Sequence, residues 1–254
     1  MLSHTEYGTD TGAPALLIAH GLFGSGRNWG VIAKRLSDSR RVITVDMRNH
    51  GTSPRADTQS YPDMAGDLAE VITTLGAPMD VCGHSMGGKA AMALALQHPD
   101  LVRRLVVADI APVAYAHSQQ QYIDAMRKVD LSTLSRRSDA EEALAAAGVE
   151  PALRSFFTQS LDVANRRWRL NLDVLEAEMD KLTGWPEDVT GPFEGPTLFL
   201  SGGASDYVQS GHRDLITTLF PAAHFAKLPD AGHWLHAEKP RDFEESLRVF
   251  LGTD

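Results

Sequence analysis

The sequence predicts an α/β protein with a mostly parallel central sheet flanked by helices. Short apolar runs alternate with longer helical patterns along most of the chain. The 254 residues are 43% hydrophobic, enough for one large α/β domain or one domain with an inserted cap. A turn centred on a serine, at residues 83–88 (Gly-His-Ser-Met-Gly-Gly), stands between an apolar run and a helical pattern. Chemistry in open α/β sheets gathers at such strand ends.

The expected strands are short runs rich in branched apolar residues. An edge strand is expected at residues 2–7, followed by a glycine-rich turn at 8–12. The expected buried strands lie at residues 15–19, 42–45, 79–82, 105–108 and 197–200, with a shorter strand at 224–228. The clearest helical patterns are residues 64–72, ended by Gly76 and Pro78, and residues 243–251.

The alternation of strands and helices breaks between residues 114 and 189, where amphipathic stretches occur without a convincing strand. We therefore expect a core formed by residues 1–113 and 190–254, with an inserted helical cap over residues 114–189. Some apolar residues of the cap are expected to line an acyl pocket, while most pack its helices together. The candidates are Phe156, Phe157, Leu161, Trp168, Leu172, Leu175 and Trp185.

Composition narrows the function classes. A formal net charge of −9 argues against non-specific binding to nucleic acid or to an anionic membrane. No apolar run is long enough to span a bilayer, and the first residues lack the pattern of a signal peptide, so a cytoplasmic protein is expected. A monomer or a homodimer is expected. The single cysteine, Cys82, ends a buried strand and is interpreted as a small hydrophobic residue.

The turn at residues 83–88 has the form of a nucleophile elbow. It follows an apolar run and precedes a helical pattern, which is the strand–turn–helix context that G-x-S-x-G requires. Glycines two residues before and after Ser85 let the strand and helix backbones approach closely. We expect Ser85 to be a nucleophile; the alternative is an ordinary glycine-rich turn.

A serine hydroxyl needs a base to take its proton, usually a histidine that a carboxylate holds. The loop at residues 230–236 follows the last short strand, and His233 within it is the expected base. His236 is the competitor, and we expect it to support the site or to lie at the surface.

An oxyanion hole needs two backbone amides. The expected donors are Met86, directly after the nucleophile, and Leu22, in the glycine-rich turn that follows the first buried strand. No phosphate-binding loop, dinucleotide motif, HExxH motif or cysteine cluster is present, so no cofactor and no metal are expected.

The acid that would hold the histidine is open between two aspartates. Asp206 lies in the turn after the strand at residues 197–200, and Asp109 ends the strand at 105–108. Both positions are strand ends that could face the site. Two charged segments are interpreted as structural: a turn at residues 46–53, with Asp46 pairing with Arg48, and a solvated helix face at residues 166–169.

The motifs together resemble the α/β-hydrolase superfamily over nearly the whole chain. They are His-Gly at residues 20–21, Asp-x-Arg-x-His-Gly-x-Ser at 46–53, the elbow, and Gly-His-Trp at 232–234. Finer matches at residues 21–25, 47–51, 87–90 and 109–113 resemble the YbfF-type bacterial esterases and related mitochondrial hydrolases.

The resemblance implies an α/β-hydrolase fold and a serine carboxylesterase that hydrolyses short-chain acyl esters or acyl thioesters. It also implies Asp109 as the acid, because the superfamily's usual aspartate position is Ser205 here. Ser205 then becomes a candidate second partner of His233. The rival functions are a C–C bond hydrolase for a diketone-type substrate and a ligand-binding module without catalysis.

Overall fold

A seven-stranded sheet forms the centre of the computed structural model, which describes residues 1–252. Its strands are β1 (His4–Tyr7), β2 (Leu16–Ala19), β3 (Val42–Val45), β4 (Met79–His84), β5 (Val102–Ala108), β8 (Thr197–Gly202) and β9 (Ala223–Leu228). Their spatial order is β1-β3-β2-β4-β5-β8-β9. β1 runs antiparallel to β3, and all other neighbours are parallel. The predicted fold class is confirmed, and each strand lies within a few residues of its expected range.

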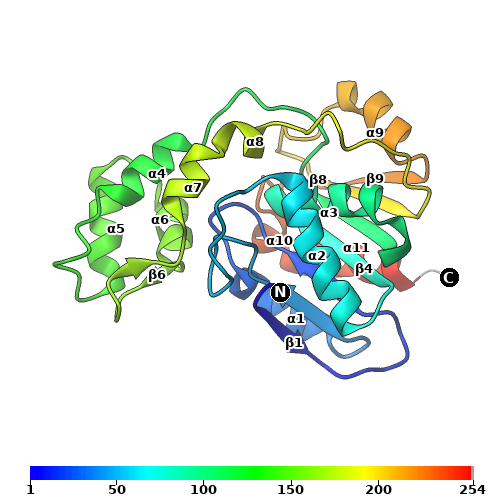
Figure 1. Ribbon diagram of the computed structural model, residues 1–254, viewed down its shortest axis with the longest axis horizontal. Coiled ribbons are helices and arrows are strands. Elements are labelled where there is room, and N and C mark those ends of the chain that lie inside the picture. The colour runs from blue at the N-terminus through cyan, green and yellow to red at the C-terminus, as the bar shows by residue number, and fades with distance from the viewer. Residues whose placement is uncertain (253–254) are drawn as a thin grey trace.

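Helices cover both faces of this sheet (Figure 1). Alternate residues of β2 point to opposite faces, so Leu16 and Ile18 join one apolar cluster while Leu17 joins the other. The first cluster packs against α1 (Gly30–Leu36) and α11 (Pro240–Gly252). The second packs against α2 (Tyr61–Leu75), α3 (Met86–Gln97) and α9 (Arg213–Leu219). Short helices η1 (Gly26–Trp29), η2 (Pro99–Leu101), η3 (Ser210–His212) and α10 (Leu235–Glu238) complete this part of the chain.

Helix α2 shows how local sequence sets an element's ends. The hydroxyl of Ser60 accepts a hydrogen bond from the amide of Asp63, and Pro62 stands in the first turn, where its missing N–H costs nothing. The helix ends at Gly76, whose φ of 117° is in the region that favours glycine. Gly76 was the predicted end of this helix, but its start at Tyr61, three residues before the apolar pattern, was not predicted.

Residues 114–189 leave the sheet after β5 and return before β8. They form α4 (Gln120–Arg127), α5 (Arg137–Ala146), α6 (Pro151–Thr158), α7 (Leu172–Ala177) and α8 (Met179–Thr183), with a two-stranded hairpin of β6 (Leu161–Asp162) and β7 (Arg167–Trp168). Figure 1 shows α4–α7 and β6 gathered at one end of the molecule, away from the central sheet.

The β6–β7 hairpin corrects one expectation. The basic stretch at residues 166–169 was interpreted as a helix face, but Arg166 has a φ of 50° in the hairpin turn and Arg167 belongs to β7. Arg167 and Arg169 both lie beside the carboxylate of Asp162, at 3.6 and 3.5 Å. Pairing between β6 and β7 determines the conformation here, and such pairing is not visible in the helical periodicity of the sequence.

Candidate active site

Ser85 occupies a sharp turn between β4 and α3. Its φ of 52° and ψ of −118° lie outside the usual regions for a residue with a side chain, as a strained nucleophile elbow requires. Close backbone approach explains the flanking glycines. A Cβ at Gly83 would stand 2.2 Å from the carbonyl oxygen of Gly87, and a Cβ at Gly87 would stand 2.4 Å from that of Ala19. Only glycine therefore allows β4, α3 and β2 to meet here.

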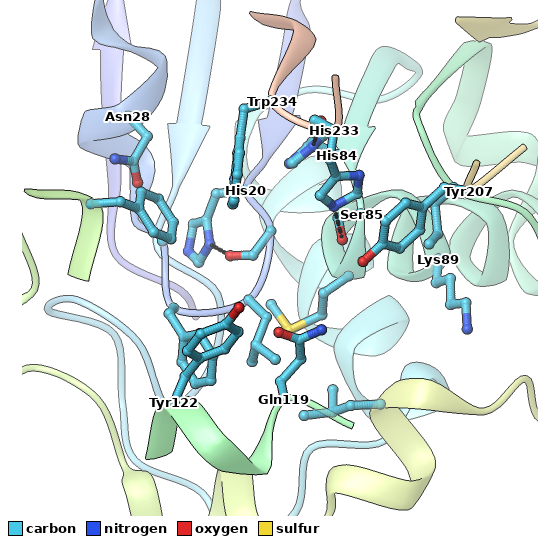
Figure 2. A pocket seen from close by; sticks show the side chains of 18 of the residues that line it. His20, Asn28, His84, Ser85, Lys89, Gln119, Tyr122, Tyr207, His233 and Trp234 are labelled. Atoms are coloured by element: carbon cyan, nitrogen blue, oxygen red, sulfur yellow. Dashed lines mark hydrogen bonds between the residues drawn. The ribbon is translucent and has the colours of Figure 1, made fainter. Parts of the chain in front are cut away.

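The hydroxyl of Ser85 is hydrogen-bonded to an imidazole. His233 Nε2 lies 3.0 Å from Ser85 Oγ (Figure 2). On the other side of the ring, His233 Nδ1 lies 2.8 Å from Asp109 Oδ2. Asp109 Oδ2 can accept only from a protonated Nδ1, so this network leaves the Nε2 lone pair to accept the serine proton. The structure thus brings together Ser85, His233 and Asp109, three residues that are up to 148 positions apart in the chain.

Asp109 is fully buried and held by three neighbours besides His233. Its own amide donates to the carbonyl of Leu200, and the amide of Gly202 donates to its Oδ1 at 2.9 Å. The Ser205 hydroxyl donates to Asp109 Oδ2 at 2.5 Å. Ser205 was expected to be a second partner of His233; it binds the carboxylate instead, because Oδ2 lies between the two side chains.

Asp206, the alternative acid, points elsewhere. It is exposed, and its carboxylate makes no hydrogen bond within the described residues 1–252. The imidazole of His233 is instead covered by the neighbouring Tyr207, whose ring stacks on it with centroids 3.9 Å apart. The hydroxyl of Tyr115 donates to the Tyr207 carbonyl at 2.8 Å, which anchors this turn. Tyr207 was not foreseen, since stacking on a distant ring leaves no local pattern.

The turn after β2 passes close to Ser85: a Cβ at Gly21 would stand 3.3 Å from the Cβ of Ser85, and Leu22 lines the same cavity as the serine. The carbonyl of Gly21, in the same peptide group as the Leu22 amide, accepts from His20 Nδ1 at 2.8 Å and from the Gly24 amide at 3.0 Å. His20 Nε2 accepts from the Met47 amide at 2.9 Å. On the other side of the serine, Met86 is the first residue of α3, so helix geometry leaves its amide without an intrahelical acceptor. Leu22 and Met86, the two expected oxyanion donors, thus line the same cavity as Ser85.

The turn at residues 46–53 is structural, as predicted, but its pairing differs from the expectation. Asp46 does not pair with Arg48; it accepts from the amides of Gly26 and Thr52 at 2.8 Å each. Arg48 instead binds Asp67 of α2, with Nε 2.6 Å from Oδ2. A bidentate guanidinium–carboxylate fit to a neighbouring helix outweighs a contact with a residue two positions away.

Four buried histidines surround the site and remain neutral. Burial lowers the pKa of His20 and His84, and lowers the pKa of His50 and His236 to about 3. His84 Nε2 lies 2.8 Å from the carbonyl of His233, so it can hold the main chain of the base. His236 is buried rather than at the surface, and its ring stacks on Trp29 with centroids 4.1 Å apart.

We expect His236→Phe to stabilise the protein, and increasingly so at acid pH. The pKa of His236 is lower in the folded state than in the unfolded state. As the pH falls below about 6.5, the unfolded state therefore binds a proton that the folded state does not, and the native protein loses stability. Within residues 1–252, His236 Nδ1 also has no hydrogen-bond partner, whereas phenylalanine keeps the stack on Trp29. Urea unfolding at pH 7, 6 and 5 measures the free energy of unfolding of both proteins. The difference in favour of His236→Phe should grow by at most about 1.4 kcal/mol for each unit that the pH falls. His224→Gln is the control, because His224 is exposed on β9. A stability difference between His236→Phe and the unmodified protein that does not change with pH would contradict the prediction.

A cavity of about 300 Å³ opens in front of Ser85. Of the seven residues between 114 and 189 that were expected to line it, Phe156 and Phe157 do so, whereas the other five pack among apolar neighbours instead. Gln119 and Tyr122 face Ser85 across the cavity (Figure 2). The helical pattern does not reveal which apolar side of a helix in residues 114–189 faces the cavity. The apolar lining that was not predicted includes Leu153, Met179 and Leu182.

Lys89, in α3, joins both ends of the 114–189 segment to the helix behind the nucleophile. Its ammonium donates to the carbonyls of Val113 at 2.7 Å, Thr183 at 3.1 Å and Gly184 at 2.5 Å. Its side chain is buried, which lowers its pKa to about 7, and it lies over the ring of Tyr115 at 4.8 Å. Three carbonyls from two distant stretches converge on one side chain, an arrangement that sequence pattern could not reveal.

Lys89→Met is expected to loosen the 114–189 segment, because it removes the side-chain donor from the half-buried carbonyls of Val113 and Gly184 and one of the two donors to that of Thr183. Limited digestion with thermolysin should cut within this segment severalfold faster than in the unmodified protein. Lys181→Met is the matched control, because in the part of the chain that the structure describes this lysine pairs only with Glu178, in the same short helical region. Equal digestion rates for the two variants would contradict the anchoring role.

Among residues 1–252, no group of three or more His, Cys, Asp or Glu side chains is arranged to hold a metal ion. Burial raises the pKa of the Cys82 thiol to about 12, so the thiol stays protonated and is a poor ligand.

A mostly parallel sheet with a serine on a strand-to-helix elbow defines the class of α/β hydrolases. The family described as alpha/beta hydrolase fold matches residues 14–240, and the chain belongs to that family. No helix in the described part of the chain is long and apolar enough to cross a membrane.

Named relatives extend over nearly the whole chain. The sn-1-specific diacylglycerol lipase ABHD11 of Mus musculus is 43% identical, covering 98% of this chain and 85% of its own length. Esterase YbfF of Escherichia coli is 37% identical, over 93% of this chain and 92% of its own length. A solved structure described as a marine microorganism esterase superposes with a TM-score of 0.93 at 37% identity, covering 98% of both chains. These relatives confirm the predicted resemblance and the predicted class of enzyme, an ester hydrolase.

Proposed function

We propose that this chain is a serine carboxylesterase that hydrolyses short-chain acyl esters or acyl thioesters through an acyl-enzyme. The observation that carries the proposal is the 3.0 Å contact between Ser85 Oγ and His233 Nε2 at the mouth of an apolar cavity. The esterase and lipase names of the relatives support the same bond type.

In the proposed mechanism, Ser85 attacks the carbonyl carbon of the ester while His233 Nε2 takes the hydroxyl proton. The negative charge that forms on the carbonyl oxygen is stabilised by the amides of Leu22 and Met86, each such donor being worth roughly 10²–10³ in rate. Asp109 keeps the proton of His233 on Nδ1 and stabilises the imidazolium. His233 then protonates the leaving alcohol or thiol, and later activates the water that releases the acid.

We propose that residues 114–189 act as a cap over the site and limit the acyl group. The cavity of about 300 Å³ is at the small end of the range for ligand pockets, which supports a short acyl chain. Phe156, Phe157 and Leu153 would contact it from the cap side. Because one relative is named a diacylglycerol lipase, glyceride esters belong beside simple esters and acyl thioesters in a substrate panel.

Covalent trapping tests the proposal directly. Incubation with an alkyl fluorophosphonate should add one phosphonyl group per chain, and peptide mapping should find it on Ser85. Stopped-flow mixing with p-nitrophenyl acetate should show a burst of p-nitrophenol as the acyl-enzyme accumulates. A label on another residue, or no label with an active enzyme, would overturn the assignment of the nucleophile.

The expected cytoplasmic location and the expected monomer or homodimer stay predictions. Sedimentation of the purified chain at several concentrations measures the second directly.

A further inference from the structure

The turn that carries Leu22 is held partly by the cap segment. Ser160 follows α6, is buried, and its hydroxyl donates a 3.0 Å hydrogen bond to the main-chain carbonyl of Phe23. Phe23 directly follows Leu22, the proposed oxyanion donor. Ser160, 137 positions along the chain from Phe23, thus binds the backbone of the residue that follows the proposed donor.

Phe23 needs such support because its backbone is in an unfavourable conformation. Its φ of 65° is in the left-handed region that a bulky side chain rarely adopts, and such residues persist only when neighbours hold them. The core holds one side, since the Phe23 amide donates to His50 Nε2 at 3.2 Å. The cap segment holds the other, through Ser160 and through Phe157, whose ring meets that of Phe23 edge to face at 5.5 Å.

A second bridge joins the same two segments. Asn28 Nδ2 donates to Gln159 Oε1 at 2.8 Å, while Asn28 Oδ1 accepts from the amide of Ser25 at 2.7 Å. Residues 157–160 of the cap segment therefore contact both the middle and the end of the turn at residues 20–28. Two polar bridges and one ring contact would all break if this stretch moved away.

We propose that Ser160 is a positioning residue that couples the seating of the cap to the oxyanion hole. Its hydrogen bond keeps Phe23 in its strained conformation, and this keeps the preceding Leu22 amide directed at the oxygen that becomes negative. An oxyanion donor accelerates the reaction only when its direction is set before the charge develops. Displacement of the cap therefore lowers the rate of the chemical step as well as changing the space for substrate. The inference rests on the proposed function, in which Leu22 is the donor.

Ser160→Ala tests this coupling. We expect kcat on p-nitrophenyl butyrate to fall about tenfold, less than the loss of a whole oxyanion donor, while KM changes less than twofold. Affinity for an alkylboronic acid should fall by the same factor, because its adduct with Ser85 places a negative oxygen in the hole. Thr158→Val is the matched control: it removes a buried hydroxyl whose partners, Glu141 and Ser155, both belong to the cap segment. That variant should keep the original kcat and boronate affinity.

Three outcomes would overturn the inference: an unchanged kcat in Ser160→Ala, an equal loss in Thr158→Val, or a loss confined to KM. Gln159→Leu is the second variant should Ser160→Ala not fold; it breaks the bridge to Asn28 and should lower kcat and boronate affinity together. Failure of the proposed function looks different, because the unmodified enzyme itself would then lack Ser85-dependent hydrolysis.

Discussion

Ser85→Ala is expected to lower kcat on p-nitrophenyl butyrate by roughly 10⁵–10⁶-fold, with KM little changed. The methyl group of alanine has no proton to give to His233 Nε2, which lies 3.0 Å from the native hydroxyl oxygen. No acyl-enzyme can form, and the two proposed oxyanion donors, the amides of Leu22 and Met86, are left to act on attack by water. Alanine is smaller than serine, so the cavity and its lining are retained. Initial rates of p-nitrophenol release, corrected for spontaneous hydrolysis, measure the effect.

Ser246→Ala is the control for this experiment, because Ser246 lies on α11 and, among residues 1–252, its hydroxyl binds only the carbonyl of Asp242. Its rate should equal that of the unmodified enzyme. If Ser85→Ala released p-nitrophenol as fast as the unmodified enzyme, another group would be the nucleophile and the esterase mechanism proposed here would fail.

Asp109→Asn is expected to lower kcat by about 10⁴-fold while leaving the fold intact. The amide of Gly202 donates to Oδ1 at 2.9 Å, so the asparagine must keep its carbonyl oxygen there and turn its NH₂ towards His233. That NH₂ can only donate, which moves the imidazole proton from Nδ1 to Nε2. Nε2 then has no lone pair for the proton of Ser85.

Asp206→Asn is the matched control, since the same change of one atom occurs in the same region of the site. Its carboxylate is exposed and makes no hydrogen bond within the described part of the chain, so kcat should change less than twofold. The two kcat values, measured with circular dichroism spectra to check folding, decide between the acids. A large loss in Asp206→Asn beside an active Asp109→Asn would reverse the assignment.

The features that sequence reasoning predicted well are encoded locally. The strand at residues 42–45 is continuous in β-branched and apolar residues because both faces of a parallel sheet are buried. The elbow is readable because close packing of β4, α3 and β2 excludes any side chain at Gly83 and Gly87. His233 is readable because this class of fold places its base in the loop after the last strand.

The features that were missed depend on contacts between distant segments. Ser205 binds Asp109 across 96 positions and Lys89 binds Gly184 across 95, and neither contact has a spacing that a period of two or 3.6 residues could reveal. The pairing of Asp46 with Arg48 was predicted from proximity in the chain. It is wrong because Arg48 reaches a carboxylate on α2 that the fold brings beside it.

The residues alone predict the α/β class, the order of the strands along the chain, a serine on an elbow and a histidine in the last loop. They do so because backbone sterics and apolar periodicity act over a few residues. The choice between Asp109 and Asp206 lies beyond that range. Only the packed sheet brings the end of β5 and the turn after β8 to the same imidazole, and the orientation of two carboxylates in space distinguishes the buried, hydrogen-bonded one from the exposed one. The same holds for Ser160, whose contact with Phe23 exists only once the cap segment lies against the core.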